Sequence, residues 1–328
     1  MNAQALCDAL RESRGFAHKR DLSDVMRRLA PALPPGIAVG DDCAAIPDGD
    51  GHLLFAIEGF VEDFVERMPW FAGYCGVMVN VSDVYAMGGR PLAVVDALWN
   101  TGAQQGAPVL DGLMEASRRY GVPIVGGHSN HKAARGQLAV AVVGRARKLM
   151  TSFDARPGDA LVMAVDVRGA WQEPYPYWNA STGAPADRLR ADLELLPCLA
   201  EEGLCDAAKD ISMAGAVGTT LMLLECSRVG ACLDTAAMPR PDATSIDDEA
   251  ALLRWLCAFP SYGFVLSVRP QNVAAVLDRF HAREIACAVV GEVHALPQVT
   301  LRHCGQEALL WDLAATPFIT AGEGAHHG

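Results

Sequence analysis

Four short segments of the sequence carry residue types that could do chemistry. Residues 40–42 read Gly-Asp-Asp, and Asn80 and Asp83 fall three positions apart in an apolar stretch. Residues 124–130 end an apolar run in Gly-Gly-His-Ser-Asn, and residues 209–218 begin Lys-Asp-Ile-Ser and contain two glycines. Carboxylates are the protein ligands that Mg²⁺ prefers, and glycines let backbone N–H groups approach a phosphate. The set indicates metal and phosphate chemistry.

The two groups of acidic residues each allow a simpler interpretation. Asp41 and Asp42 are adjacent, so their side chains point apart, and an isolated Gly-Asp-Asp is more often a turn than a metal site. On a helix Asn80 and Asp83 share a face. A carboxylate among so many apolar residues is costly to bury unless it is paired or bound to a cation. The alternative is a solvated Asp83 on an exposed face.

The other two segments point to an anion. Gly126 and Gly127 end a buried strand, where their backbone could approach a phosphate. His128 and His131 have the spacing of a zinc pair, but no third ligand or Cys-x-x-Cys accompanies them, which disfavours zinc. A helix is expected over 213–228, with Ser212 or Asp210 as its N-cap, and a helix N-terminus with nearby glycines is also an anion site.

Composition limits the class of protein. The 328 residues are 51% hydrophobic and 20% charged, which excludes a disordered chain. The net charge of −12 disfavours nucleic acid and anionic membranes as partners. A polyanionic ligand would have to be attracted by something other than the net charge, and a bound divalent cation is the usual device.

The N-terminus carries charged residues where a signal peptide needs an apolar core, and no later stretch is long enough to span a membrane. Ten cysteines lie scattered without a Cys-x-x-Cys pair. We therefore expect a soluble, cytoplasmic protein whose cysteines are mostly buried free thiols.

The hydrophobic periodicity predicts an α/β (α+β) protein of two domains, residues 1–150 and 151–328. In the first domain we expect short N-terminal helices that end at the breaker 34–36, then a helix stopped by Gly88 and Gly89. The other elements expected there are strands over 52–57, 91–98, 122–127 and 137–146 and helices over 61–68, 72–87 and 108–120. In the second domain we expect strands over 160–167, 263–268, 286–293 and 299–303, helices over 187–203, 213–228, 247–256 and 270–280, and a frayed tail.

The loop after the first strand of the second domain is rich in aromatic residues and prolines. Trp171, Tyr175 and Trp178 stand in it. We interpret them as substrate contacts on a lid; a dimer contact or a simply packed loop is the alternative.

In this order, the segments resemble the AIR-synthetase-related (PurM-like) ATP-binding superfamily. The resemblance extends from about residue 37 to 293 and rests on Gly-Asp-Asp, Val-Asn-Val-Ser-Asp with Ala-Met-Gly-Gly, Gly-Gly-His-Ser, Lys-Asp-Ile-Ser and the closing Val-Val-Gly-Glu-Val. The superfamily includes aminoimidazole ribonucleotide synthetase, thiamine-monophosphate kinase and selenophosphate synthetase. In length and in the drift of its motifs the chain is also similar to an AIR-synthetase-like subgroup found beside nitrilase genes.

The resemblance implies a homodimer paired through its N-terminal domains, with ATP and Mg²⁺ as cofactors. The implied metal ligands are Asp41, Asp42, Glu58, Asp83 and Asp210. The implied nucleotide contacts are Asp41, Asp42, Asn80, Gly126, Gly127, His128 and Asp210.

Three positions depart from the family's patterns. Glu58 stands where thiamine-monophosphate kinases carry aspartate, and Met213 stands where they carry a second acid after Asp-Ile-Ser. His128 is closer to the selenophosphate synthetase pattern, but that enzyme's reactive N-terminal motif is missing, since Cys7 sits in plain helical sequence.

We therefore expect a Mg²⁺-dependent enzyme that transfers the terminal phosphoryl group of ATP to an oxygen of a small molecule, an amide, carboxylate or hydroxyl. Kinase and ring-closing ligase chemistry both fit this description. Asp83 is the first candidate for catalysis as a metal bridge, with His128 and Lys209 as further contacts. The rival hypothesis is a noncatalytic ATP-binding assembly or regulatory subunit, which Met213 and Glu58 favour.

Overall fold

The computed structural model describes residues 2–33 and 38–320, and these fold into two compact units. The five-stranded unit contains residues 42–149 and 184–201. The seven-stranded unit contains the described residues of 1–41, 150–183 and 202–328. This grouping differs from the one expected from a single boundary near residue 150, which places residues 2–41 with the five-stranded unit and residues 184–201 with the seven-stranded unit. The expected breaker at 34–36 and the expected tail from residue 321 lie outside the described residues.

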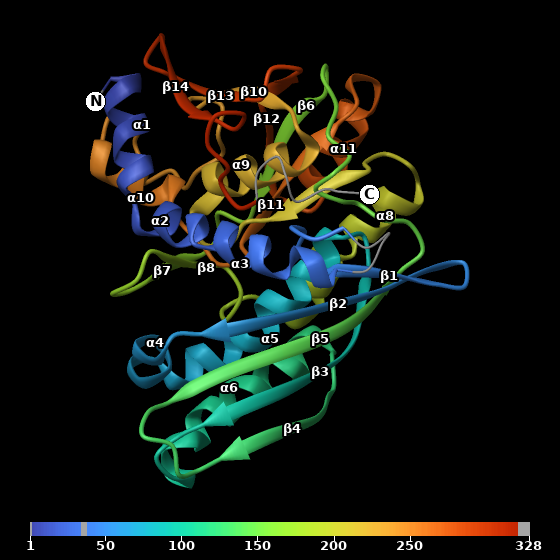
Figure 1. Cartoon of the computed structure of the whole chain (residues 1–328), viewed down its shortest axis with the longest axis vertical. Helices are drawn as coiled ribbons and strands as arrows, with labels where there is room; N and C mark the ends of the chain where they lie inside the picture. The colour runs from blue at the N-terminus through green and yellow to red at the C-terminus, as the bar shows by residue number, and fades with distance from the viewer. Residues whose placement is uncertain (1, 34–37, 321–328) are drawn as a thin grey trace. The chain divides into compact units, whose positions relative to one another are not determined.

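The five-stranded unit is one sheet in the strand order β1-β2-β5-β3-β4. Strands β3 and β4 are parallel, and the connection between them is helix α6; the other pairs are antiparallel. Helices α5 and α6 lie on one face of this sheet (Figure 1). The elements are β1 (Ala44–Asp48), β2 (Gly51–Phe60), α4 (Glu62–Arg67), α5 (Pro69–Ala86), β3 (Arg90–Trp99), α6 (Ala103–Tyr120), β4 (Ile124–Asn130), β5 (Gln137–Ala146), α7 (Ala186–Leu193) and α8 (Leu195–Glu201).

Glycines allow α5 and α6 to pack with their backbones in close approach. A Cβ built on Gly112 of α6 would lie 1.9 Å from the carbonyl oxygen of Trp70, and one on Gly73 of α5 would lie 2.0 Å from that of Val109. No larger side chain fits at either position. This approach fixes α5 against its neighbour and so fixes the direction of the side chains that α5 carries.

The turn after α5 ends the helix as expected. Gly88 has φ +73°, and the N–H groups of Gly88 and Gly89 donate to the carbonyls of Tyr85 and Val84. A left-handed glycine just past the last helical turn is the usual way to satisfy these carbonyls. The predicted stop at the two glycines is confirmed.

The helix-free face of the five-stranded sheet is apolar. Register places Ile57 of β2, Ala141 of β5 and Val95 of β3 in one row across three strands, with Phe55 beside Val143 in the next row. Ile57 is 65% exposed and Phe55 is 52% exposed. We call these five residues the open sheet face.

The seven-stranded unit has the strand order β14-β13-β10-β12-β6-β11-β9, in which only β10 and β13 pair in parallel. A separate hairpin, β7 with β8, follows β6. The elements are α1 (Ala3–Glu12), α2 (Arg14–Arg20), α3 (Leu22–Leu29), η1 (Ala30–Ala32), β6 (Ala160–Val165), β7 (Ala170–Gln172), β8 (Tyr177–Asn179), β9 (Ala207–Asp210), α9 (Gly215–Ser227), β10 (Gly230–Asp234), α10 (Glu249–Leu256), β11 (Gly263–Val268), η2 (Pro270–Asn272), α11 (Val273–His281), β12 (Ala286–His294), β13 (Gln298–His303) and β14 (Gln306–Asp312).

The N-terminal helices belong to the core of the seven-stranded unit. Leu6 and Leu10 of α1 are fully buried with the apolar side chains of α9, and Phe16 of α2 packs edge-on against Phe318 at a centroid distance of 5.2 Å. Arg11 donates to the carbonyls of Leu309 and Leu310. These contacts anchor the first part of the chain to its last strand.

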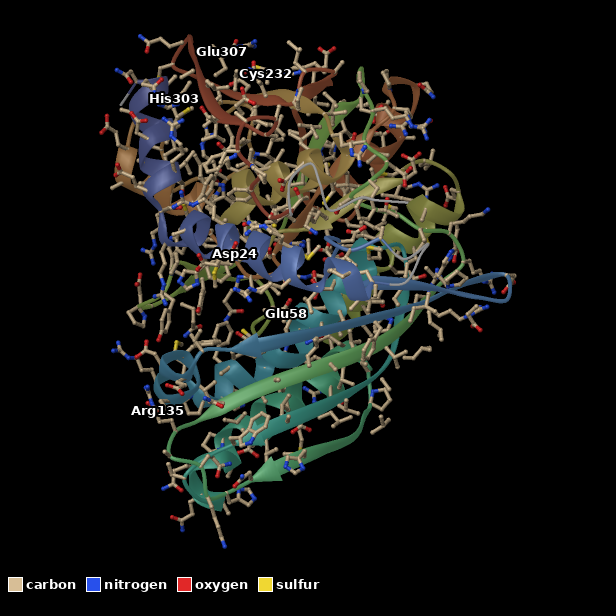
Figure 2. All side chains as sticks on the ribbon, in the orientation of Figure 1. Asp24, Glu58, Arg135, Cys232, His303 and Glu307 are labelled. Carbon is tan, nitrogen blue, oxygen red and sulfur yellow. The ribbon has the colours of Figure 1, made fainter. Side chains whose placement is uncertain are left out.

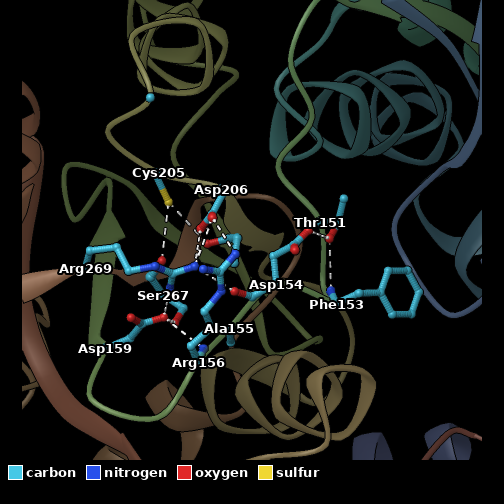
Figure 3. A network of polar contacts seen from close by, with 12 residues as sticks. Thr151, Phe153, Asp154, Ala155, Arg156, Asp159, Cys205, Asp206, Ser267 and Arg269 are labelled. Atoms are coloured by element: carbon cyan, nitrogen blue, oxygen red, sulfur yellow. Dashed lines mark hydrogen bonds and ion pairs between the residues drawn. The ribbon is translucent and has the colours of Figure 1, made fainter.

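An arginine links the two ends of β11 and β9 to the turn before β6 (Figure 3). Arg269 pairs with Asp159 and with Asp206, and it donates to the carbonyl of Asp154. Ser267 donates to the same Asp159 at 2.7 Å. These contacts hold the segment 151–159, which contains Ser152, in place.

The mixed α/β class predicted from the sequence is confirmed, and two predicted helices differ in detail. The stretch 187–203 is two helices, α7 and α8, because Pro197 lacks the N–H that a continuous helix needs and is tolerated only in the first turn of α8. The stretch 270–280 begins as the 3₁₀ turn η2 before α11. Strands β1, β7, β8, β9, β10 and β14 were not predicted.

Within the described residues, no helix is both long and apolar enough to cross a membrane.

Gly112→Ala is expected to lower the free energy of unfolding by at least about 3 kcal/mol, because its methyl group would overlap the Trp70 carbonyl. Gly59→Ala is the matched control, since a Cβ at Gly59 meets nothing within 4 Å. Urea denaturation of both variants measures the difference. Equal stability of the two variants would show that α5 and α6 separate at little cost.

Candidate functional site

Asn80 of α5 ties the helix to strand β5. Its side chain is fully buried, and Nδ2 donates to the carbonyls of Gly76 at 2.8 Å and Val140 at 3.0 Å. Because both partners are acceptors, the amide cannot be turned around. Its Oδ1 has no hydrogen-bond partner within the described part of the chain. Asn80 thus leaves one buried oxygen acceptor one helical turn before Asp83.

Asp83 is buried on the same helix. Its relative exposure is 6%, and its neighbours Val81 and Val84 are fully buried. The alternative of a solvated aspartate on an exposed face is therefore wrong. A carboxylate in such surroundings stays ionised only with a cation or hydrogen-bond donors near it.

Gly126, Gly127 and His128 lie on β4, the edge strand of the five-stranded sheet, and all three are exposed. A Cβ at Gly126 would meet nothing within 4 Å, so the backbone there is open. The ring of His128 lies 6.4 Å from that of Trp99. An edge strand presents N–H groups that its single neighbour does not use. The position suits an anion, as predicted, and no contact here tests it.

Asp96 is a candidate that the sequence analysis missed. It pairs in register with Gly127, and a Cβ on that glycine would lie 2.5 Å from Asp96 Oδ1. The absence of a side chain at Gly127 thus leaves room for the Asp96 carboxylate. Burial raises the pKa of Asp96. The available signal was an acidic residue inside the apolar run of residues 91–98.

The other acidic residues predicted for the five-stranded unit are more exposed. Glu58 lies exposed on β2 (Figure 2), opposite Val140 in register. Asp42 is half-buried and directly precedes Cys43 and β1.

Asp41 belongs to the seven-stranded unit and is engaged there. Its Oδ2 accepts from the backbone N–H of Ser152 at 2.8 Å, and its Oδ1 accepts from the Ser152 hydroxyl at 2.6 Å. Lys209 Nζ lies 3.8 Å from Oδ1, and the exposures of the Asp41 and Lys209 side chains are 2% and 4%. The structure therefore brings together two residues to which the sequence analysis gave separate roles.

Asp210 follows Lys209 on β9 and is almost fully buried. Its Oδ2 accepts from the Ser261 hydroxyl at 3.0 Å. The neighbouring Tyr262 hydroxyl is buried with no hydrogen-bond partner in the described residues, and burial raises the pKa of Tyr262. The hydrogen bond from Ser261 therefore orients Asp210 in a buried polar environment within the seven-stranded unit.

The expected N-cap of α9 is wrong. The helix starts at Gly215 with Ala214 as the capping residue in a left-handed conformation, and no side chain caps it. Backbone crowding explains this: a Cβ at Gly15 of α2 would lie 2.6 Å from Ala214 Cα, and one at Gly215 would lie 2.1 Å from the Leu256 carbonyl. Ser212 contributes its carbonyl to Gly215 instead.

The aromatic loop is the β7–β8 hairpin. Trp178 is 5% exposed, stacks edge-on against Trp255 at 5.2 Å, and donates to the Asp166 carbonyl. The Arg254 guanidinium lies 3.9 Å from the ring centre of Trp171. Tyr175 is half-buried and stacks on Tyr177 at 4.8 Å. These contacts are those of a packed loop, and a substrate role for the three residues stays a prediction.

The cysteines are free thiols, as expected, in all ten positions. Burial raises the pKa of Cys7 to about 11 and of Cys287 to about 12. Such thiols are protonated at neutral pH and serve as apolar side chains. Cys304 is the exposed exception.

A magnesium ion is implied by the resemblance, and the structure tests which residues suit it. Among the described residues no three His, Cys, Asp or Glu side chains form a metal-binding group. Mg²⁺ held together with phosphates needs only one or two carboxylates from the protein. Asp83, with the buried Oδ1 of Asn80 one turn away, offers a fitting set of hard oxygen donors. Asp41 is already supplied with donors and a cation.

Comparison with known families matches the two halves of the chain separately. Residues 40–146 match the model "AIR synthase related protein, N-terminal domain", and residues 169–304 match the C-terminal domain of the same description. An uncharacterized protein of Synechocystis is 45% identical over 94% of this chain and 95% of its own length. Thiamine-monophosphate kinase of Pyrococcus horikoshii is 34% identical over 37% of this chain and 41% of its own length.

Solved structures show the same fold. T. maritima PurL complexed with ATP superposes with a TM-score of 0.74 at 20% identity; the match covers 98% of this chain and 53% of PurL. AaThiL complexed with AMPPCP and TMP gives 0.67 at 19% identity and covers 87% of this chain and 93% of its own. The chain spans about half of PurL and nearly all of AaThiL.

The raised pKa of Asp96 predicts a pH effect on stability. An acid whose pKa is higher in the folded state binds more protons there. The stabilisation that it gives the folded state is therefore fully present below its unfolded pKa of about 3.9 and is lost as the pH rises through its folded-state pKa. Asp96→Asn is therefore expected to raise the melting temperature at pH 7 by about 1–3 °C and to change it little at pH 4. Calorimetry at both pH values measures this; a lower melting temperature at pH 7 would contradict it.

Proposed function

The chain belongs to the AIR-synthase-related family, and we propose that it is a Mg²⁺-dependent enzyme that transfers the terminal phosphoryl group of ATP to an oxygen of a small molecule. The family includes kinases that use ATP, and structures of two relatives contain ATP or AMPPCP. The acceptor oxygen we propose is that of an amide, a carboxylate or a hydroxyl.

One observation carries the proposal: Asp83 is a buried carboxylate and the one charged residue of helix α5. Keeping such a group costs stability unless the folded protein gains something from it. A cation that also binds a nucleotide supplies that gain, and it lets a protein of net charge −12 hold a polyanion.

In the five-stranded unit, Asp83 and Asp42 would hold the magnesium ion, with Asn80 Oδ1 directed by its two hydrogen bonds. When bound, Mg²⁺ neutralises charge on the phosphate oxygens. The open backbone of Gly126 and the exposed ring of His128 are placed to contact a phosphate. Catalysis on this account is positioning and charge neutralisation. Asp210 stays a proposed acidic contact from the seven-stranded unit.

The acceptor oxygen decides what kind of enzyme this is. Transfer to a hydroxyl makes a stable phosphate ester, which is kinase chemistry. Transfer to an amide or carboxylate oxygen makes the carbon that bears this oxygen a better target for attack by a nitrogen nucleophile, which is ligase chemistry.

A noncatalytic nucleotide-binding subunit is the second candidate. It is favoured by Met213, which cannot ligate a hard cation at the position after Asp210, Ile211 and Ser212. The two candidates differ in whether ADP is released when amides, carboxylates and alcohols are supplied with MgATP.

We also propose that the protein forms a homodimer through the open sheet face. An apolar patch that includes Ile57, Phe55 and Val95, exposed by 65%, 52% and 41%, is unusual for a surface that stays in water. A second copy of the same sheet offers a complementary apolar surface, because an isologous contact uses one patch twice.

Asp83→Asn is expected to weaken binding of MgATP at least about tenfold, because the variant keeps the shape of the side chain and loses the charge that holds the metal. Isothermal titration calorimetry with and without Mg²⁺ measures the effect. Asp111→Asn, at an exposed aspartate of α6, is the matched control and should bind as the wild type does. Unchanged affinity in Asp83→Asn would remove the proposed metal site.

Ile57→Asp is expected to convert the dimer into monomers, because it places a charge at the most exposed position of the apolar row. Light scattering coupled to size-exclusion chromatography gives the mass of each variant. Leu296→Asp is the control, since Leu296 is 67% exposed in the seven-stranded unit. A wild-type monomer, or a dimer that survives Ile57→Asp, would contradict the proposed interface.

A further inference from the structure

The two adjacent acids of Gly-Asp-Asp have different surroundings. The Asp41 side chain is 2% exposed and receives two hydrogen bonds from Ser152, one to each carboxylate oxygen. Asp42 is half-buried, and it is the first residue of the five-stranded unit. The chain thus leaves one unit between these two carboxylates.

The donors to Asp41 are themselves held in place. The Ser152 carbonyl accepts from the Ser227 hydroxyl at 2.7 Å, and the same hydroxyl accepts from the Ala155 N–H at 3.0 Å. Gly40, with φ +120°, makes the turn that directs Asp41 to Ser152, and its carbonyl accepts from the Cys226 thiol. A donor set fixed from several elements does not need to reorganise around the carboxylate.

Lys209 supplies the positive charge. Its side chain is 4% exposed on β9, and its Nζ lies 3.8 Å from Asp41 Oδ1. A buried ammonium and a buried carboxylate are each costly alone and become tolerable together, when hydrogen bonds satisfy the remaining atoms. The two hydrogen bonds from Ser152 satisfy the oxygens of Asp41 in this way, beside its ion pair with Lys209.

We infer that Asp41, Lys209 and Ser152 form a built-in ion-pair unit, in which the lysine ammonium does for Asp41 what a divalent cation would otherwise do. Asp41 is then a positioning residue that anchors the chain where it leaves the seven-stranded unit. Of the two adjacent acids, Asp42 alone is left to ligate the metal. The assignment of Asp42 rests on the proposed function; the role of Asp41 does not.

On this inference Asp41 does not ligate the metal, and Lys209 pairs with Asp41 instead of acting as the catalytic contact expected from the sequence. Mg²⁺ demands oxygen ligands at about 2.0–2.1 Å in near-octahedral order, and a metal that close to Asp41 would compete with the two Ser152 donors and with the Lys209 ammonium 3.8 Å from Oδ1.

The test is a double-mutant cycle read by thermal unfolding. Asp41→Asn and Lys209→Met are each expected to lower the melting temperature by about 6–15 °C, because each leaves one buried charge without its partner. The double variant removes both charges, so its loss of melting temperature is expected to be well below the sum of the losses in the two single variants. It also provides a folded protein if a single variant does not fold. Additive losses in the double variant would overturn the ion-pair unit.

Metal binding is measured on the same proteins by titrating Mn²⁺ in the presence of AMPPCP and following free Mn²⁺ by electron paramagnetic resonance. Asp41→Asn, or the double variant, is expected to keep the wild-type affinity within about threefold, whereas Asp42→Asn loses at least about tenfold. A tenfold loss in Asp41→Asn with an unchanged melting temperature would make Asp41 a ligand and overturn the inference. If the wild type binds no Mn²⁺, the proposed function and the role of Asp42 fail, while the melting cycle still decides the role of Asp41.

Discussion

A carboxylate removed from water must be matched by a cation or by hydrogen-bond donors, and this requirement organises the molecule. Asp41 is matched inside the fold by Lys209 and Ser152, and Asp159 is matched by Arg269 and Ser267. Asp83 is buried on α5, a helix with no other charged residue, one turn after Asn80, whose Nδ2 donates to two backbone carbonyls. On the proposed function, Asp83 binds a Mg²⁺ ion, and that ion lets a protein of net charge −12 hold a nucleotide.

The scaffold around Asp83 is built to keep that side chain in one place. The close approach of α5 and α6 at Gly73 and Gly112 leaves no room for the helices to slide. The two hydrogen bonds of Asn80 fix the rotation of α5 over β5. On the neighbouring edge strand, Gly127 makes space for Asp96, whose raised pKa marks a second carboxylate kept against its own solvation preference. Sites that carry such costs are often functional.

Much of the fold could be predicted from local sequence. The glycine stop after α5 and the strands over 91–98, 137–146 and 263–268 follow from periodicity and turn chemistry. The family follows from the ordered motifs, and the comparisons confirm it. Strands β7 and β8 were missed because each has only three residues in a loop rich in proline. The N-cap of α9 was predicted wrongly: the helix starts after the left-handed Ala214, whose backbone packs against Gly15, some 200 residues away in sequence.

The candidate site shows the same division. Residue types and spacing were enough to place Asp83 on a helix and the two glycines on a strand, because helix and strand geometry is local; their role in a site stays a prediction. The partnership of Asp41 with Lys209 joins residues 168 positions apart, and no spacing rule reveals such a pair. Asp96 was passed over because a single acid in an apolar run carries no motif. Its meaning appears only when β4 is laid beside β3.

The account stands or falls on whether the buried carboxylate of α5 ligates the metal that holds the nucleotide. A crystal structure of the protein with Mn²⁺ and AMPPCP, with the metal located by its anomalous signal, tests this directly. The account predicts a Mn²⁺ peak about 2.0–2.3 Å from an oxygen of Asp83, with Asp41 still bonded to Ser152. A peak ligated by Asp41, or a bound nucleotide whose metal lies away from Asp83, would contradict it.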